Sequence, residues 1–216
     1  MLASLQKHIV DIYKADSGHQ VADFLITDRT LADYVGDSTL AAGVEETVFV
    51  AEDDDGMAVS VYLDHALMSR LDCMSPLNKL KPEQLSDLST VLEGVSHFNY
   101  LAWSANHDRS VTLLELELQA EVDKFVATTL MALEQNDLDF ARELHRWLFD
   151  EVRYQSSLDS EQRERYETAN DYASRFCHRI LDRIDDASCS RELRDFYRLS
   201  QGDKISHIHS LAWSAR

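Results

Sequence analysis

Hydrophobic and polar residues alternate most regularly in TVFVAEDDDGMAVSVYL, residues 47–63. Two runs rich in β-branched residues, each with a period of two, flank Asp55-Gly56, a dipeptide typical of tight hairpin turns. The pattern therefore predicts a β-hairpin over about 47–63. The acidic residues at its tip are consecutive and lack the alternating spacing of a calcium-binding loop, so we expect a solvated turn.

Outside this segment, apolar residues recur mainly at helical spacing, and only 6 glycines and 2 prolines interrupt the chain. In the first third the pattern predicts helices over 2–14, about 28–34 and 65–71, with a short strand over 21–26. In the remainder it predicts longer helices over 83–106, 110–135, 138–155, 159–185, 190–200 and 204–214. Helix therefore dominates the second half of the chain.

These elements predict an α+β fold that is mostly α, in which a small N-terminal module with a β-hairpin precedes an antiparallel helical bundle. We place the module at 1–75 and, at 76–83, a connection that holds both prolines of the chain. The bundle, at 84–216, is expected to pack on the module. One continuous domain is the alternative.

Charge is distributed unevenly along the chain. The net charge is −18, and residues 1–137 hold 24 acidic and 8 basic side chains, against 15 and 13 in residues 138–216. Such acidity disfavours nucleic acid and anionic membranes as ligands, so we expect neither. We expect the front carboxylates to meet arginines of the back half, within one fold or between subunits.

Cysteine use and hydropathy bear on the compartment. Cys73, Cys177 and Cys189 are few, odd in number and widely spaced, which favours a reducing environment over a disulfide framework. No stretch approaches the roughly 20 apolar residues of a membrane helix, and no signal-peptide pattern opens the sequence. We therefore expect a cytoplasmic protein.

Two pairs of residues, one Glu/His and one Glu/Glu, are candidate metal ligands. Glu93 and His97 lie one turn apart on one predicted helix, and Glu117 and Glu121 lie one turn apart on the next. Carboxylates and imidazoles from neighbouring helices are how helical bundles bind divalent metals. The Glu-x-x-His and HExxH patterns of well-known metal sites are absent, so a network of surface ion pairs is the competing interpretation.

Candidate interaction residues occur on two later helices. Aromatic residues follow seven-residue spacing at Phe140, Trp147 and Tyr154, and exposure of that row would mark a subunit or partner contact. Arginines stand one turn apart at Arg175, Arg179 and Arg183, a spacing that suits carboxylates or phosphates. Given the overall charge, we expect these arginines to bind carboxylates of the chain or of a partner.

One stretch of sequence is repeated. SHFNYLAWSA at 96–105 and SHIHSLAWSA at 206–215 share seven of ten residues, so His97 corresponds to His207 and Trp103 to Trp213. The apolar positions also correspond, and both segments would bury the same face if helical. The match is either coincidental reuse of a helix-packing pattern or a sign that the two segments occupy equivalent places in the bundle.

No phosphate-binding loop, dinucleotide fingerprint, nucleophile elbow or zinc-ribbon motif is present. We therefore expect a non-catalytic interaction or regulatory protein that self-associates or binds a basic partner protein and needs no cofactor. The alternative is a metal-dependent, hydrolase-like enzyme that uses a divalent metal at the Glu/His residues. A third hypothesis is a nucleic-acid mimic whose carboxylates imitate phosphates.

Overall fold

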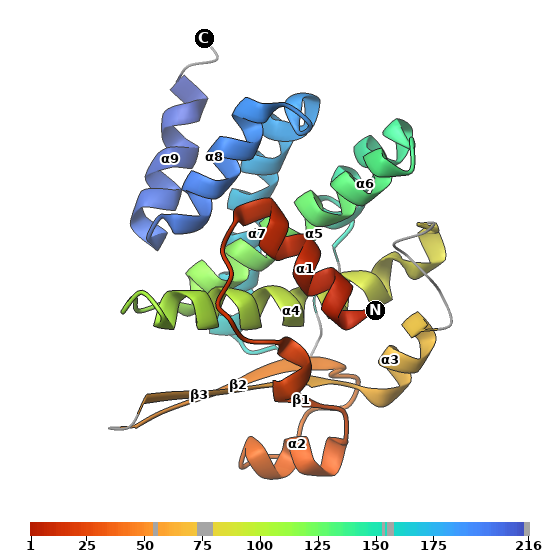
Figure 1. Ribbon diagram of the computed structural model, residues 1–216, viewed down its shortest axis with the longest axis vertical. Helices are drawn as coiled ribbons and strands as arrows, with labels where there is room; N and C mark the ends of the chain where they lie inside the picture. Colours follow the sequence, from red (N-terminus) through yellow and green to blue (C-terminus); the bar gives the residue numbers. More distant parts are fainter. Residues whose placement is uncertain (54–55, 73–79, 153, 155–157, 214–216) are drawn as a thin grey trace. The chain divides into compact units, whose positions relative to one another are not determined.

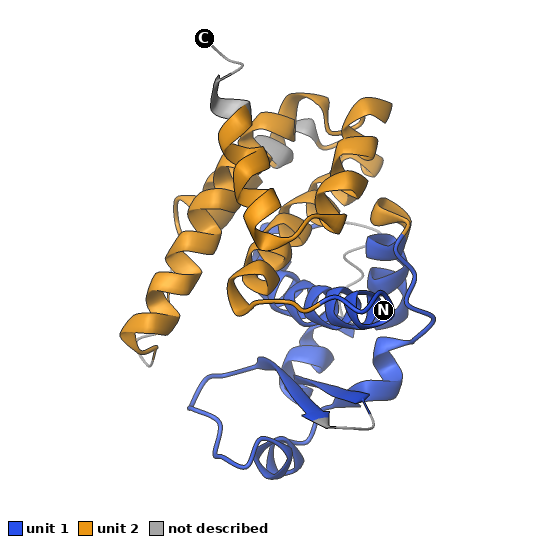
Figure 2. Cartoon of the chain, turned by 90° about the vertical axis from the view of Figure 1, so that its left-hand side faces the viewer, with its two compact units in different colours: residues 1–10, 15–109 blue, residues 11–14, 110–216 orange. Residues whose placement is uncertain are grey.

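The computed structural model confirms an α+β fold that is mostly helical (Figure 1). It describes residues 1–53, 56–72, 80–152, 154 and 158–213. The described chain forms two compact units, which Figure 2 distinguishes by colour. Unit 1 comprises residues 1–10 and 15–109, and unit 2 comprises residues 11–14 and 110–216.

Unit 1 contains a three-stranded sheet and the helices around it. Its elements are α1 (Leu2–Tyr13, whose last three residues belong to unit 2), a 3-10 turn (Val21–Phe24), β1 (Leu25–Ile26), α2 (Arg29–Val35), β2 (Glu46–Asp53), β3 (Gly56–Leu63), α3 (His65–Asp72), a second 3-10 turn (Pro82–Gln84) and α4 (Leu85–Ala105). The strand order is β1-β3-β2. Strand β3 pairs antiparallel with β2, from Asp53 opposite Gly56 to Glu46 opposite Leu63, and parallel with β1. The predicted hairpin is therefore confirmed, while Asp54 and Asp55 at its tip lie outside the described residues.

The sheet lies between α2 and α4 (Figure 1). Helix α4 approaches β2 and β3 closely at Gly94, where a Cβ would lie 3.1 Å from Leu63 and 3.2 Å from both Val61 and Glu46. On the α2 side, a Cβ on Gly36 would meet the ring of Phe49 at 2.6 Å. Two glycines thus set how closely helix and sheet pack.

The predicted strand over 21–26 is wrong for its first four residues. Val21–Phe24 is a 3-10 turn, and only Leu25 and Ile26 pair with β3. The cause is a distant side chain: the buried amide of Gln6 on α1 accepts a hydrogen bond from the Val21 N–H and donates to the carbonyl of His19. This bonding satisfies the backbone locally, so no strand partner is needed.

Unit 2 is a helical bundle. It contains α5 (Leu113–Glu134), α6 (Leu138–Phe149), α7 (Ser160–Ile180) with a final 3-10 turn (Leu181–Arg183), α8 (Ala187–Arg198) and α9 (Gln201–Trp213). Side chains cap the first three helices: Thr112 caps α5, Asp137 caps α6, and Asp159 forms a capping box with Gln162 on α7. The core includes stacked rings of Phe176 and Phe196, whose centroids are 4.1 Å apart.

The end of α1 is part of unit 2. Tyr13 stacks on Tyr197 of α8 with ring centroids 4.4 Å apart. From the same helix, Arg194 donates to the carbonyl of Ile12, and Arg198 donates to the carbonyls of Tyr13 and Lys14. These bonds satisfy carbonyl groups that the end of α1 leaves without helical partners.

The division between units falls after α4, at residues 109 and 110. The predicted connection was at 76–83, of which residues 76–79 lie outside the described residues. The close packing of α4 on β2 and β3 at Gly94 explains why this helix belongs with the sheet. No helix among the described residues combines the length and apolar character needed to cross a membrane.

The predicted helix over 138–155 is too long. Helix α6 ends at Phe149, where Asp150 donates its backbone N–H to the carbonyl of Arg146. The backbone N–H of Glu151 donates to the same carbonyl at 3.1 Å, and the chain leaves the helix there. No glycine or proline stands in this stretch, so the sequence carries no clear stop signal.

Candidate functional site

Three ligand-type side chains meet between α4 and β2 in unit 1. Glu93 and His97 lie one turn apart on α4, with a carboxylate oxygen and a ring nitrogen within 4.8 Å of each other. Glu46, the first residue of β2, places Oε1 3.4 Å from Nδ1 of His97. Residues able to hold a metal ion are therefore present in this unit.

This cluster is well shielded from solvent. His97 is 5% exposed, and the side chain of Glu46 is 11% exposed. Gly94 admits Glu46 to this position, because a Cβ there would lie 3.2 Å from its Cγ. Charges in such a setting are less screened than at the surface, so the carboxylates act strongly on the imidazole.

The other two predicted metal ligands, Glu117 and Glu121, belong to α5 in unit 2. Within that unit, Glu117 lies 3.9 Å from the guanidinium of Arg165, and Glu121 forms an ion pair with Lys124 at 2.8 Å. Both acids thus have cationic neighbours on their own unit. A metal site shared by Glu93, His97, Glu117 and Glu121 stays a prediction.

Unit 2 also contains a buried polar network that sequence reasoning missed. Lys204 on α9 is fully buried; its ammonium donates to the side-chain oxygen of Gln119 and, at 2.8 Å, to the carbonyl of Phe196. Gln119 in turn donates to Asp123 at 2.6 Å. Burial and the nearby charge of Asp123 raise the pKa of Tyr13 well above its ordinary value. Lysine is rarely buried without such partners. These hydrogen bonds of Lys204 hold the N-terminal part of α9 against α5 and α8.

The three arginines that stand one turn apart, Arg175, Arg179 and Arg183, pair with carboxylates of their own unit. Arg175 pairs with Asp171 one turn away at 2.7 Å, while Arg179 and Arg183 both approach Glu192 on α8. His207 on α9 approaches the same carboxylate at 3.1 Å. Burial would raise the pKa of Glu192, but hydrogen bonds from Arg183 and His207 outweigh it, and the pKa is lowered. This pairing joins α7, α8 and α9.

The predicted aromatic row is interrupted. Phe140 and Trp147 are half-buried on α6, but Tyr154 lies beyond the helix end, so the three rings do not share one helical face. Tyr154 instead lies beside Arg163, whose guanidinium carbon is 5.9 Å from the ring centroid. The prediction from seven-residue spacing is therefore wrong for Tyr154, which does not lie on the same helix as Phe140 and Trp147.

Both repeated segments are helical over their described residues. The first lies in α4 of unit 1, and the second lies in α9 of unit 2, whose last residue is Trp213. Phe98 and Ile208 are both buried, at 1% and 4% exposed, whereas Ile205 is only half-buried and its counterpart Val95 is fully buried. Trp103 is also buried, beside the ring of His107. That both segments bury the same face stays a prediction.

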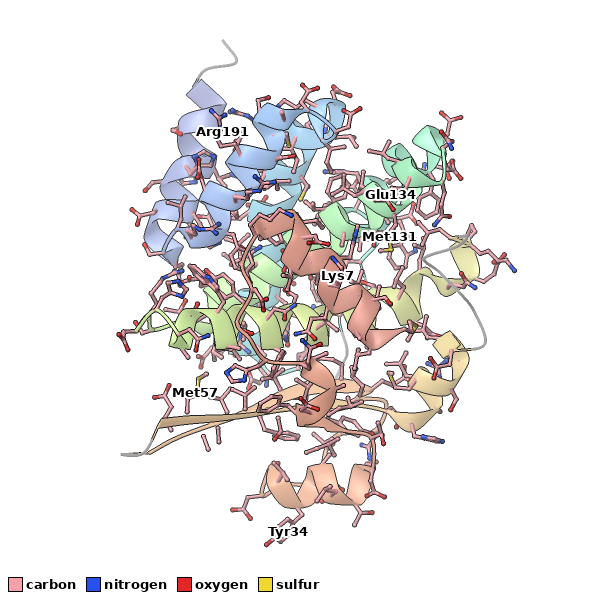
Figure 3. All side chains as sticks on the ribbon, in the orientation of Figure 1. Lys7, Tyr34, Met57, Met131, Glu134 and Arg191 are labelled. Atoms are coloured by element: carbon pink, nitrogen blue, oxygen red, sulfur yellow. The ribbon has the colours of Figure 1, made fainter. Side chains whose placement is uncertain are left out.

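Helix α2 presents an apolar stripe that the sequence analysis did not single out. Leu31, Tyr34 and Val35 follow i, i+3, i+4 spacing and are 49%, 83% and 42% exposed, while Ala32 on another face is fully buried. Figure 3 shows Tyr34 pointing away from the sheet. The helical spacing of these residues was the signal that would have revealed the stripe.

Comparisons with known proteins give no further guide: no family model matches the chain, and neither curated proteins nor solved structures yield a match.

Proposed function

We propose that this chain is a non-catalytic cytoplasmic interaction protein, and that α2 binds a basic partner protein. The observation that carries the proposal is the exposed stripe of Leu31, Tyr34 and Val35. An amphipathic helix normally buries such a stripe, and i, i+3, i+4 anchors are a common means of helix recognition. Cys177 and Cys189 are free thiols, which agrees with a reducing compartment, while Cys73 lies outside the described residues.

The charge around the stripe indicates the kind of partner. Between residues 15 and 69 the sequence has 12 Asp and Glu residues and a single Lys or Arg, Arg29. The guanidinium of Arg29 donates to the carbonyls of Leu40, Ala41 and Val44, so its hydrogen bonds hold α2 to the following loop. A second copy of the same surface would bring two acidic segments together. A basic segment with apolar side chains fits better.

A photo-crosslinking amino acid at position 34 in cells tests this proposal. We expect an adduct with a protein that has a basic, amphipathic segment, and no such adduct when the label replaces Leu113, another exposed apolar residue, which belongs to unit 2. With the purified partner, Tyr34→Glu should weaken binding about 10-fold or more, and added salt should weaken the wild-type complex.

Three other outcomes would count against this function. Absence of a position-specific adduct would remove the evidence for a binding surface. An adduct between two copies, with a dimer in light scattering, would assign the stripe to self-association. Competition by duplex DNA for the partner would assign the surface to nucleic-acid mimicry.

A metal-dependent, hydrolase-like enzyme is the second candidate, favoured by the paired donor atoms of Glu93 and His97. A divalent metal at this pair would polarise a substrate or activate a water molecule. Elemental analysis of protein purified without a histidine tag tests this function. We expect close to one metal ion per chain; substoichiometric metal, with no thermal shift on adding Zn²⁺ or Mn²⁺, would contradict it.

A further inference from the structure

We propose that His97 binds a divalent transition metal through Nε2, together with a carboxylate oxygen of Glu93, and that Glu46 is the positioning residue that holds the ring. This inference rests on the second candidate function and gives it a ligand arrangement. It adds Glu46, which lies 51 positions before His97 in the sequence and on a different element.

The tautomer of His97 follows from its contact with Glu46. An ionised carboxylate only accepts hydrogen bonds, so Nδ1 of His97 is the donor across the 3.4 Å contact. A neutral imidazole carries one ring proton, and with that proton on Nδ1 the lone pair is on Nε2. Metal-binding histidines commonly have this arrangement, in which a carboxylate fixes the ring and raises its basicity.

The second ligand is positioned by helix geometry. Glu93 lies four residues before His97, on the same face of α4, and the two donor atoms are within 4.8 Å. Metal–nitrogen and metal–oxygen bonds of about 2.0–2.2 Å bring two ligand atoms of a tetrahedral ion to roughly 3.3 Å apart. A small rotation of the Glu93 side chain covers the difference.

Charge and burial favour a divalent cation at this place. The carboxylates of Glu46 and Glu93 bring two negative charges close to the imidazole of His97, a residue that is 5% exposed. Their charge balances that of one divalent ion. The mixed nitrogen and oxygen donors suit Zn²⁺ or Mn²⁺ better than Mg²⁺ or Ca²⁺, which prefer oxygen ligands alone. Among the two, Zn²⁺ should bind more tightly.

The experiment uses the full chain without a tag, freed of metal by a chelator, and titrated with Zn²⁺ against a competing chromophoric chelator. We expect one high-affinity site per chain. His97→Ala and the isosteric Glu93→Gln should each weaken it by about 100-fold, whereas Glu46→Gln should weaken it about 10- to 100-fold. His207→Ala, which alters the matching histidine of the repeated segment, is the control. Circular dichroism checks that each variant is folded.

A second measurement, on the metal-free protein, reports on Glu46 directly. Long-range ¹H–¹⁵N spectra of the imidazoles should show His97 with its proton on Nδ1 in the wild type, and a shift toward the other tautomer in Glu46→Gln. A merely structural role of Glu46 would leave this tautomer unchanged.

The two parts of the inference fail in different ways. A wild-type chain that binds no Zn²⁺ or Mn²⁺ overturns the metal site and the second candidate function together. Wild-type affinity and tautomer in Glu46→Gln, with loss in His97→Ala and Glu93→Gln, overturn only the positioning role. A proton on Nε2 of His97 in the metal-free wild type overturns the proposed ligand geometry.

Discussion

Helices α4 and α9 carry nearly the same sequence in different electrostatic surroundings. In both, a histidine contacts a glutamate from another element, but His97 uses Nδ1 toward Glu46 and His207 uses Nε2 toward Glu192. Glu192 also binds Arg183, whereas the neighbour of His97 on its own helix is the acid Glu93. The same helical segment therefore gives an acidic cluster in unit 1 and a mixed-charge cluster in unit 2.

The correspondence extends upstream of the repeated segments. An acid precedes each histidine by four residues, but Asp203 accepts a hydrogen bond from the Ser200 hydroxyl at the start of α9. The next position is Gly94 on α4 and the buried Lys204 on α9. A missing side chain admits a glutamate in one unit, and a long cation fills the core in the other. The helix residue just before each repeated segment, together with the neighbouring elements, therefore decides the chemistry of that segment.

The largest expected effect comes from removing the buried cation of α9. Lys204→Met leaves the oxygen of Gln119 and the carbonyl of Phe196 without this donor in the core, so it should lower the free energy of unfolding by about 3 kcal/mol. Urea unfolding measures the loss. Lys14→Met, at a side chain 58% exposed, should change stability by no more than about 0.5 kcal/mol. Equal effects of the two changes would show that Lys204 does not stabilise the core.

The glycines of the two helices provide the next comparison. Gly94→Val should cost about 1–3 kcal/mol, because its side chain would press on Leu63, Val61 and Glu46. Gly202→Ala on α9 meets nothing within 4 Å and should stabilise by a few tenths of a kcal/mol through helix propensity. Thermal unfolding compares the two variants. A neutral Gly94→Val would contradict the close helix-to-sheet contact.

Acid should weaken the Glu192 cluster. The pKa of Glu192 is lowered from 4.5, so the folded state binds fewer protons there than the unfolded state does. Its stabilising contribution is complete above that value and is lost as the pH falls through the lower, folded pKa. With partial solvent screening we expect roughly 1 kcal/mol or less. Unfolding curves between pH 6 and 3 should show a smaller pH dependence in Glu192→Gln; an unchanged slope would refute this.

The smallest expected effect concerns metal binding at the matching histidine. His207→Ala should leave Zn²⁺ affinity within about 2-fold of the wild type, because Arg183 and Arg179 beside Glu192 disfavour a second cation there. The titration described above measures it. A loss as large as that of His97→Ala would mean that the two histidines are not chemically distinct.

Local pattern predicted much of this fold. Alternation around Asp55-Gly56 located the hairpin, and helical periodicity located α4 and α5. These features depend on residues close in sequence, so the sequence displays them directly.

The rest depends on distant partners. Glu46 meets His97 across 51 positions, and Gln119 meets Lys204 across 85, so no local pattern marks either contact. The end of α6 was missed because no glycine or proline marks it in the sequence. The candidate metal pair could be found from i, i+4 spacing, but its positioning carboxylate could not.

Helix α8 binds the end of α1, so the order in which the ribosome makes the two segments affects when they can pack together. Arg194 and its acceptor, the carbonyl of Ile12, are 182 positions apart, so the start of the chain emerges long before its partner. At roughly 5–20 residues per second, the end of α1 waits about 10 to 40 s before unit 2 can close around it. During that interval Tyr13 has no stacking partner in Tyr197. The end of α1 therefore reaches its native packing only after nearly the whole chain has been synthesised.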